Sequence, residues 1–405
     1  MKGEETFLHS YLEFDFYSIS SNSKWWAEII KYGYKYNREF VPSLSDRMPI
    51  EEYFARFQSD KGFTIVAIDK NEFVGCLCNF FNHPETNRPW YQCIIINKKY
   101  RQNKLAHKFY ELSDNILKEK SELFVQGRTW VENIKNRRAL KSIGFYQIET
   151  LINDRGVGIH TLLYEKCLFN SEYFKGIKRL GILGGLGSIA SAKFFSDICH
   201  LTSQTEKEQE QLPITVHSET QTPDRTELIL SNRKPELVKL LNHQIKSLLD
   251  SNCSHIVICC FSYHSVINEI DQSIRVHVVS LIDYTTKLLE NKKGTYLSLA
   301  TLGSYKLNLL GHIDNILYPN EADQSNVHDC IYRIKKGEPK ELVLIDLEKI
   351  IQNYNCTGIV LGCTDLYLLT DHFELYFKYL EIISPLKVLT YDITNNYKVN
   401  EAKHS

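Results

Sequence analysis

Apolar and polar residues change their spacing several times along the chain, and each spacing predicts a different element. Between residues 60 and 168, short β-rich segments joined by turn-like residues predict a meander of strands at 63–68, 73–81 and 90–97. Apolar side chains then recur at helical spacing from Leu105 to Leu117, which predicts an amphipathic helix that begins at about residue 103. An aromatic-rich stretch before residue 60 is also predicted to be helical.

The pattern changes again near residue 175. The segment 165–179 has no clear periodicity, whereas RLGILGGLGSIASAKFFSDI predicts a strand, a glycine-rich turn and a helix. From there onward, β-branched apolar runs alternate with amphipathic helical stretches, which is typical of parallel sheets flanked by helices. We therefore predict a domain boundary near residue 175.

The second half contains an internal repeat. LGGLGS at 183–188 matches LATLGS at 299–304, and each is followed by an apolar run that ends in a cysteine. The serine and the cysteine are 72 residues apart in the first copy (188 to 260) and 59 in the second (304 to 363). A polar insertion at 202–211 can hold the extra length. We expect two similar lobes that face each other, with the carboxyl ends of their strands lining a shared cleft.

These patterns predict an α/β protein with two domains, at 1–170 and 177–405. The second domain is expected to consist of two pseudo-symmetric, flavodoxin-like α/β lobes. Lobe 1 would span about 177–284 plus 385–405, and lobe 2 about 285–384.

Composition limits the classes of partner. The 405-residue chain has a net charge of -1, so it has no global field that would attract nucleic acid or an anionic membrane. No apolar run approaches the roughly 20 residues that span a bilayer, and the acidic start MKGEETFLHS lacks the features of a signal peptide. We expect a cytoplasmic protein that binds small molecules, neither nucleic acid nor membrane, and a homodimer is left open.

The eleven cysteines are an odd number and lack metal-like pairing, so free thiols in a reducing compartment are expected. Cys260 in IVICCFSYH and Cys363 in IVLGCTDLY each follow an apolar run predicted to be a buried strand. At such positions one thiolate could take a proton from a carbon while an opposite thiol donates one to the other face. The alternatives are buried structural cysteines or a disulfide, and the repeat favours the catalytic interpretation.

Residues 178–391 resemble the aspartate/glutamate racemase family, whose members invert amino acids with two cysteines and without pyridoxal phosphate. The motifs that carry the resemblance are GILGGLGS (181–188), PDRTELIL (223–230), CFSYH (260–264), LATLGS (299–304) and GCTDLYLL (362–369). The resemblance implies that Cys260 and Cys363 are the two acid/base thiols. It also implies that racemisation needs neither a cofactor nor a metal.

The same resemblance implies a substrate site around the thiols. Arg225 would pair with a side-chain carboxylate of the substrate through its bidentate fork. Phe261 stands where the family usually has Asn, which indicates a changed carboxylate contact or a changed substrate. His264 has two open interpretations, a role next to the catalytic groups or simple packing. The full set of residues expected to bind substrate or shape its site is Gly185, Gly187, Arg225, Ser262, His264, Thr301, Ser304, Thr364 and Asp365.

Residues 60–165 resemble the GNAT family of acetyl-CoA-dependent N-acetyltransferases. Backbone N–H groups at a helix N-terminus bind anions, and the predicted helix starts in a basic stretch. The resemblance implies an acetyl-CoA site there, with Lys104 in place of the family's first glycine. No general acid or base is assigned, and Tyr100 and Glu132 are only candidates. The residues expected to bind acetyl-CoA are Arg101, Gln102, Asn103, Lys104, Leu105, Ala106 and Asn133.

Together the resemblances predict a bifunctional enzyme, an Asp/Glu-type racemase fused to an acetyltransferase that acts on the racemised amino acid. Acetylation of one enantiomer would draw the mixture toward it, because racemisation alone approaches an equal mixture. Two alternatives stay open. One is a racemase whose first domain is a degenerate acyl-CoA-binding module, and the other is a non-catalytic amino-acid-binding protein.

Overall fold

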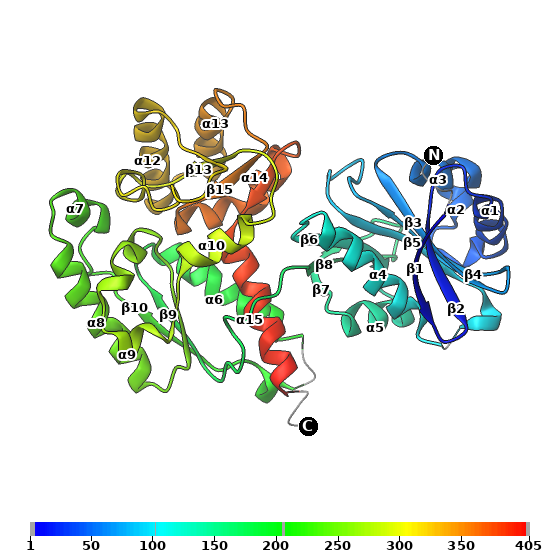
Figure 1. The fold of residues 1–405 in the computed structure, drawn as a ribbon, viewed down its shortest axis with the longest axis horizontal. Helices are drawn as coiled ribbons and strands as arrows, with labels where there is room; N and C mark the ends of the chain where they lie inside the picture. Colours follow the sequence, from blue (N-terminus) through cyan, green and yellow to red (C-terminus); the bar gives the residue numbers. More distant parts are fainter. Residues whose placement is uncertain (1–4, 102, 205–206, 402–405) are drawn as a thin grey trace. The chain divides into compact units, whose positions relative to one another are not determined.

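The computed structural model describes residues 5–101, 103–204 and 207–401, and the chain forms two compact units, Met1–Phe169 and Asn170–Ser405 (Figure 1). The border between the units lies in the segment where the sequence loses its periodicity. Among the described residues, none of the helices combines the length and the apolar character that crossing a membrane requires.

The first unit is built on one eight-stranded sheet with the order β1-β2-β3-β4-β5-β6-β8-β7. Its strands pair antiparallel, except that β5 and β6 run parallel. The predicted meander corresponds to β3, β4 and β5, whereas β1 and β2 were not foreseen. The strands are β1 (Glu5–Tyr11), β2 (Phe14–Ile19), β3 (Gly62–Asp69), β4 (Glu72–Phe80), β5 (Trp90–Ile96), β6 (Phe124–Trp130), β7 (Tyr146–Leu151) and β8 (Thr161–Cys167).

Helices cover both faces of this sheet, and each face has its own apolar core. Helices α1 to α3 lie on one face, and α4 and α5 lie on the other (Figure 1). The helices are α1 (Trp25–Lys35), α2 (Leu44–Arg47), α3 (Ile50–Ala55), α4 (Leu105–Glu119) and α5 (Ile134–Ser142), with short 3-10 helices η1 (Asn37–Glu39), η2 (Arg56–Gln58) and η3 (Lys98–Tyr100).

The two parallel strands of the first unit separate along their length. Trp90 pairs with Gln126 and Tyr91 pairs with Gly127, and the ladder ends there. The carboxyl halves of β5 and β6 therefore diverge. Helix α4 follows β5 and helix α5 follows β6, so both helices begin near the mouth of this gap.

The second unit contains two four-stranded parallel sheets, with the orders β10-β9-β11-β12 and β14-β13-β15-β16. In each sheet the first strand along the chain lies second in the order, which is the flavodoxin-like arrangement. The predicted fold class is therefore confirmed, and the two lobes share one strand order. The strands are β9 (Leu180–Gly184), β10 (Ile214–Ser218), β11 (His255–Ile258), β12 (Val278–Val279), β13 (Tyr296–Leu299), β14 (Ile316–Leu317), β15 (Gly358–Leu361) and β16 (Glu381–Ile383).

Each lobe of the second unit has its own core, and α15 packs against α6 and α10 of lobe 1. The expected lobe border at 284/285 falls within α10. The helices are α6 (Ser188–Thr202), α7 (Arg225–Leu230), α8 (Lys234–Asp250), α9 (Gln272–Arg275), α10 (Leu281–Leu289), α11 (Leu302–Lys306), α12 (Glu321–Lys335), α13 (Lys340–Ile351), α14 (Thr370–Tyr376) and α15 (Pro385–Glu401), with 3-10 helices η4 (Glu208–Glu210), η5 (Ser262–Glu269) and η6 (Thr364–Leu369).

The repeat places the two cysteines in equivalent positions. Cys260 lies between β11 and η5, and Cys363 lies between β15 and η6. Strands β11 and β15 are interior strands of their sheets, and each delivers its cysteine at its carboxyl end. In a doubly wound sheet this is the edge where ligands bind.

Candidate active sites

One cavity in the second unit is lined by both lobes and contains both thiols. Cys260 comes from lobe 1 and Cys363 from lobe 2. Both cysteines are free, and they are 7% and 6% exposed, respectively. The structure therefore brings together the two residues that the sequence repeat singled out.

The cavity is nearly closed. Its volume is about 10 Å³, which is room for about one water molecule. A molecule with more than a few atoms does not fit in this cavity as the structure has it. A site that closes in this way excludes water from the reacting groups.

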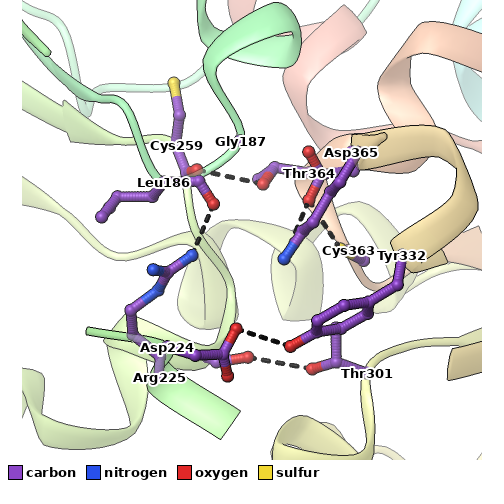
Figure 2. A network of polar contacts seen from close by, with 12 residues as sticks. Leu186, Gly187, Asp224, Arg225, Cys259, Thr301, Tyr332, Cys363, Thr364 and Asp365 are labelled. Carbon is purple, nitrogen blue, oxygen red and sulfur yellow. Dashed lines mark hydrogen bonds and ion pairs between the residues drawn. The ribbon is translucent and has the colours of Figure 1, made fainter. Parts of the chain in front are cut away.

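Cys363 is surrounded by two charged groups. Its Sγ donates to Asp365 Oδ2 over 3.5 Å (Figure 2). Lys335 Nζ lies 3.6 Å from the same carboxylate oxygen. Burial raises the pKa of Cys363, the Asp365 charge raises it further, and Lys335 opposes both effects. Burial lowers the pKa of Lys335, but the charges of Cys363 and Asp365 outweigh this and raise it.

Burial also raises the pKa of the Asp365 carboxyl, and the positive charge of Lys335 opposes this rise. Cys363, Asp365 and Lys335 therefore form one coupled group at the carboxyl end of β15. Protons in such a group belong to the set rather than to one residue.

Cys260 has a different neighbour, the buried guanidinium of Arg225. Arg225 is held by carbonyl groups, because its Nη2 donates to Leu186 O over 2.5 Å (Figure 2) and its Nη1 reaches Thr222 O and Pro223 O. Burial lowers the pKa of Arg225, but the charge and hydrogen bond of Cys260, together with the charges of Asp224 and Asp365, outweigh this and raise it. The Arg225 Nε–H has no partner within the described chain, so one buried donor is available to a ligand.

Side-chain hydroxyls connect the two lobes beside the thiols. Ser262 Oγ lies 3.0 Å from both Thr301 Oγ1 and Ser304 Oγ. Thr364 Oγ1 donates to Cys259 O over 3.0 Å (Figure 2). Ser262, Thr301 and Thr364 line the cavity, whereas Ser304 is outside the lining and contacts Ser262 and Thr301.

The predicted glycines act through backbone geometry. Gly185 has a φ of +79°, and a Cβ on Gly187 would lie 2.0 Å from Asp365 Oδ1. Neither glycine lines the cavity, although Leu186 between them does. Gly187 therefore allows the Asp365 carboxylate to approach the first lobe closely.

His264 lies outside the cavity lining. It is 2% exposed, its Nε2 is 3.4 Å from Ile258 O, and burial lowers its pKa to about 4. A neutral, enclosed imidazole favours the packing interpretation. Phe261, by contrast, lines the cavity and shapes its wall.

Three polar residues at this site were missed in the sequence. Lys335 and Asp224 line the cavity, and Tyr332 OH donates to Asp224 Oδ2 over 2.6 Å across the lobes (Figure 2). Tyr332 and Lys335 are three residues apart on α12, which is the spacing of one helix face. That spacing is a usable signal, but a sequence does not reveal which face meets the other lobe.

The first unit has a larger cavity, of about 680 Å³, in the gap between β5 and β6. Leu105 and Ala106, the first residues of α4, line it together with Asn133, which caps α5 by accepting from Asn136 N over 3.3 Å. Lys104 has a φ of +54°, a left-handed conformation that favours the glycine usual at this position. Lys104 therefore adopts at this position a backbone conformation that a glycine would adopt more easily.

The other residues predicted to bind acetyl-CoA contribute unequally. Arg101 lines the cavity, but it pairs with Glu39 over 2.9 Å, and Asn103 is not in the lining. Gln102 lies outside the described residues. Of the two acid/base candidates, Tyr100 lines the cavity and Glu132 does not.

The walls of this cavity fit a long, partly apolar ligand such as acetyl-CoA. Leu77, Ile94 and Leu140 supply apolar surface, and the α4 N-terminus supplies N–H donors for an anion. Thr129 Oγ1 lines the same cavity, is buried, and has no hydrogen-bond partner within the described chain. Such an unpaired buried hydroxyl suits a site that a ligand completes.

Comparison with solved structures gives distant matches to both units. An aspartate racemase from Picrophilus torridus is 22% identical, with a TM-score of 0.47 over 55% of this chain and 94% of that protein. An aspartate racemase homologue from Pyrococcus horikoshii OT3 is 17% identical, with a TM-score of 0.43 over 55% and 99%. A Desulfovibrio desulfuricans protein described as a GNAT-family acetyltransferase is 13% identical, with a TM-score of 0.34 over 38% and 99%.

The family model described as Asp/Glu/Hydantoin racemase matches residues 183–391. The match begins in β9 and ends in α15, so it includes both lobes and both cysteines. It spans more than half of the 405 residues, and the chain therefore belongs to the Asp/Glu/Hydantoin racemase family.

Proposed function

We propose that the second unit racemises an amino acid by proton transfer between two thiols. The observation that supports this most is that Cys260 and Cys363, delivered by equivalent elements of two lobes, line one cavity. One cysteine, as a thiolate, takes the α-proton, and the electron pair of the broken C–H bond stays on the carbon. The other thiol then gives its proton to the opposite face. The product has the inverted configuration, and the two sulfurs have exchanged protonation states.

The intermediate carries negative charge next to the α-carboxylate, and that charge needs fixed donors. The unpaired Nε–H of Arg225 and the hydroxyls of Ser262 and Thr301 line the cavity, and Lys335 adds a second cation. Preorganised donors in a closed site are worth more than in water. Two cations in one cavity also suit an acidic amino acid of the Asp/Glu type, and Phe261 limits its shape.

Exchange of the α-hydrogen in heavy water tests this mechanism. Asp and Glu of each hand are incubated with the wild type, Cys260→Ser and Cys363→Ser, and both optical inversion and deuterium at Cα are measured. Each variant should lose about 10²- to 10⁴-fold in racemisation, because one acid/base group is removed. Cys199→Ser is the matched control, since Cys199 lies on α6 outside the cavity lining. Unchanged racemisation in either cavity variant would refute the two-thiol mechanism.

We also propose that the first unit is an acetyl-CoA-dependent N-acetyltransferase. Acetyl-CoA would supply an activated acetyl thioester, with its pyrophosphate at the N-terminus of α4 beside Leu105 and Ala106. In the transfer, the amine nitrogen bonds to the acetyl carbon and the C–S bond breaks. The proton lost by the nitrogen ends on the thiol that leaves.

Binding and turnover are tested separately. Ala106→Asp places a carboxylate where the pyrophosphate is expected, so it should weaken acetyl-CoA binding by about tenfold or more through charge repulsion. Glu111→Gln, on the same helix but outside the cavity lining, is the control. Mass spectrometry then checks for N-acetylated amino acid and free thiol. Binding without any acetylated product would favour the degenerate acyl-CoA module.

A further inference from the structure

Three arginines meet at one end of the first unit's cavity. Arg47 ends α2, Arg128 lies on β6, and Arg155 lies in the loop between β7 and β8, and all three line the cavity. Arg47 and Arg155 both donate to Val41 O, so their guanidinium groups are close together. Segments far apart in the chain thus supply one cationic cluster.

Aromatic rings hold two of these guanidinium groups in place. Arg128 lies over the Trp90 ring, 5.9 Å from its centroid, and Arg155 lies over the Trp130 ring at 5.5 Å. Stacking on a ring fixes the plane of a guanidinium while its N–H edges remain available for hydrogen bonds. The cluster is therefore organised before a ligand arrives.

The cluster lacks an acidic ion-pair partner within the described parts of the chain. Among the described residues, no carboxylate forms an ion pair with Arg47, Arg128 or Arg155, and the cavity's Glu39 is engaged by Lys98 and Arg101 at 2.9 Å each. Burial, together with the charges of Arg47 and Arg128, lowers the pKa of Arg155 to about 10, and Asp154 only partly opposes this. Arg47 Nε is also buried, and it has no hydrogen-bond partner among the described residues. Desolvated like charges with unused donors indicate a site for an anion.

The cluster lies on the opposite face of the sheet from the expected acetyl-CoA site. Trp90 and Cys93 belong to the core that packs under α1 to α3, whereas Leu105 and Leu140 belong to the core under α4 and α5. The cavity includes residues of both faces and passes through the gap where β5 and β6 diverge. Donor and acceptor could therefore enter from opposite faces and meet in the gap.

We infer that Arg47, Arg128 and Arg155 form the acceptor subsite of the first unit and bind an amino acid that carries two carboxylates. This inference rests on the proposed acetyltransferase function. The guanidinium groups would bind the α-carboxylate and the side-chain carboxylate, and the amine would point toward the gap between β5 and β6. The acceptor would then belong to the same acidic class as the substrate proposed for the second unit.

Tryptophan fluorescence provides a readout specific to this unit. The chain has 4 tryptophans, Trp25, Trp26, Trp90 and Trp130, and all of them precede residue 170. Ligand binding in the second unit therefore has no tryptophan to report it directly. Trp90 and Trp130 contact the cluster itself.

The full-length protein is titrated with N-acetyl-L-glutamate and with N-acetyl-L-glutamine, which lacks the second carboxylate. The acid should bind about tenfold or more tightly than the amide, because a charged bidentate contact is lost in the amide. Arg128→Gln and Arg155→Gln should each weaken the acid by about tenfold and change acetyl-CoA binding less than about twofold. Arg138→Gln, an exposed site on α5 outside the lining, should change neither.

The outcomes separate this inference from the proposed function. Equal binding of acid and amide, or no binding of the acid, would overturn the acceptor subsite even if neutral amines are acetylated. Loss of acetyl-CoA binding in the arginine variants would assign the cluster to the donor's phosphates instead, and would also overturn it. Arginine-dependent binding of the acid without acetylation of any amine would support the anion site and count against the acetyltransferase. Thermal unfolding of each variant checks that the fold is retained.

Discussion

Cys260 and Cys363 occupy equivalent positions in the two lobes, but their electrostatic environments differ. Cys260 lies beside the guanidinium of Arg225, whose Nη1 and Nη2 donate to carbonyl groups. Cys363 lies between an anion and a cation, because it donates to Asp365, which pairs with Lys335. The repeated fold thus fixes where the two thiols lie, and the charges around each thiol come from residues that do not repeat.

Thermodynamics limits how far the unequal environments of the two thiols can affect the kinetics. Enantiomers have equal free energy in water, so at equilibrium the two are equally populated and kcat/KM must be the same in both directions. Unequal thiols can therefore change only how kcat and KM are divided between the L and D substrates. The equality of kcat/KM for the L and D substrates holds for every variant. A variant that alters the neighbours of one thiol can therefore be tested in both directions.

The largest effect is expected from removing the cation beside Cys363. Lys335→Met leaves Asp365 and a developing thiolate without their counter-ion, so kcat/KM should fall by about 10²- to 10³-fold, equally for both enantiomers. Polarimetry or chiral chromatography measures both directions. Lys336→Met is the matched control, because Lys336 is exposed and lies just beyond α12. Equal losses in the two variants would show that Lys335 has no special role.

A second variant tests the close approach of Asp365 to lobe 1. In Gly187→Ala the added Cβ would lie 2.0 Å from Asp365 Oδ1, so the carboxylate and Cys363 must shift. Misplacement of this kind costs about 10²-fold in rate. The control is the same substitution in an Asp365→Ala background, where the clash is absent and little further loss is expected. Additive losses would mean that Gly187 acts elsewhere.

A smaller effect is expected at the hydrogen bond that closes the lobes. Tyr332→Phe removes the donor to Asp224 Oδ2, which should cost about 1 kcal/mol of unfolding free energy and favour the open cavity. The expected kinetic result is a changed KM. Tyr354→Phe is a matched control, because Tyr354 OH donates to Asp323 over 2.7 Å within lobe 2. It should lose similar stability with an unchanged KM, and identical KM values in both variants would contradict a closing role for Tyr332.

The sequence predicted those features of the fold and the site that a local residue pattern encodes. Apolar runs that end in Cys260 and Cys363 identify buried strands and their carboxyl ends, and the repeated motifs predict two similar lobes. In contrast, Tyr332 and Lys335 belong to an amphipathic helix whose orientation depends on how lobe 2 packs. Arg47, Arg128 and Arg155 are far apart in the chain, and only the pairing of strands and the path of the loops bring them together.

The edge strand β1 shows the same limit. The residues of Glu5–Tyr11 show no clear alternation of apolar and polar positions, and none of them is fully buried. The gap between β5 and β6 was also hidden, because nothing in the residue pattern of either strand marks the point where their pairing ends. Divergence depends on tertiary packing, and local periodicity does not record it.

The smallest predicted effect concerns the pH profile of kcat/KM, which depends on both thiols. Asp365 raises the pKa of Cys363, so Asp365→Asn should lower that pKa. The limbs of the kcat/KM profile belong to the pair of thiols, and both should move to lower pH by about one unit. Because a lower pKa makes the Cys363 thiolate easier to form, the kcat values of the two enantiomers should change by different factors while kcat/KM stays equal. Asp371→Asn, at an exposed site on α14, should leave the profile in place. A shift to higher pH would contradict this role of Asp365, because the charge of Lys335, which remains in the variant, lowers the pKa of Cys363.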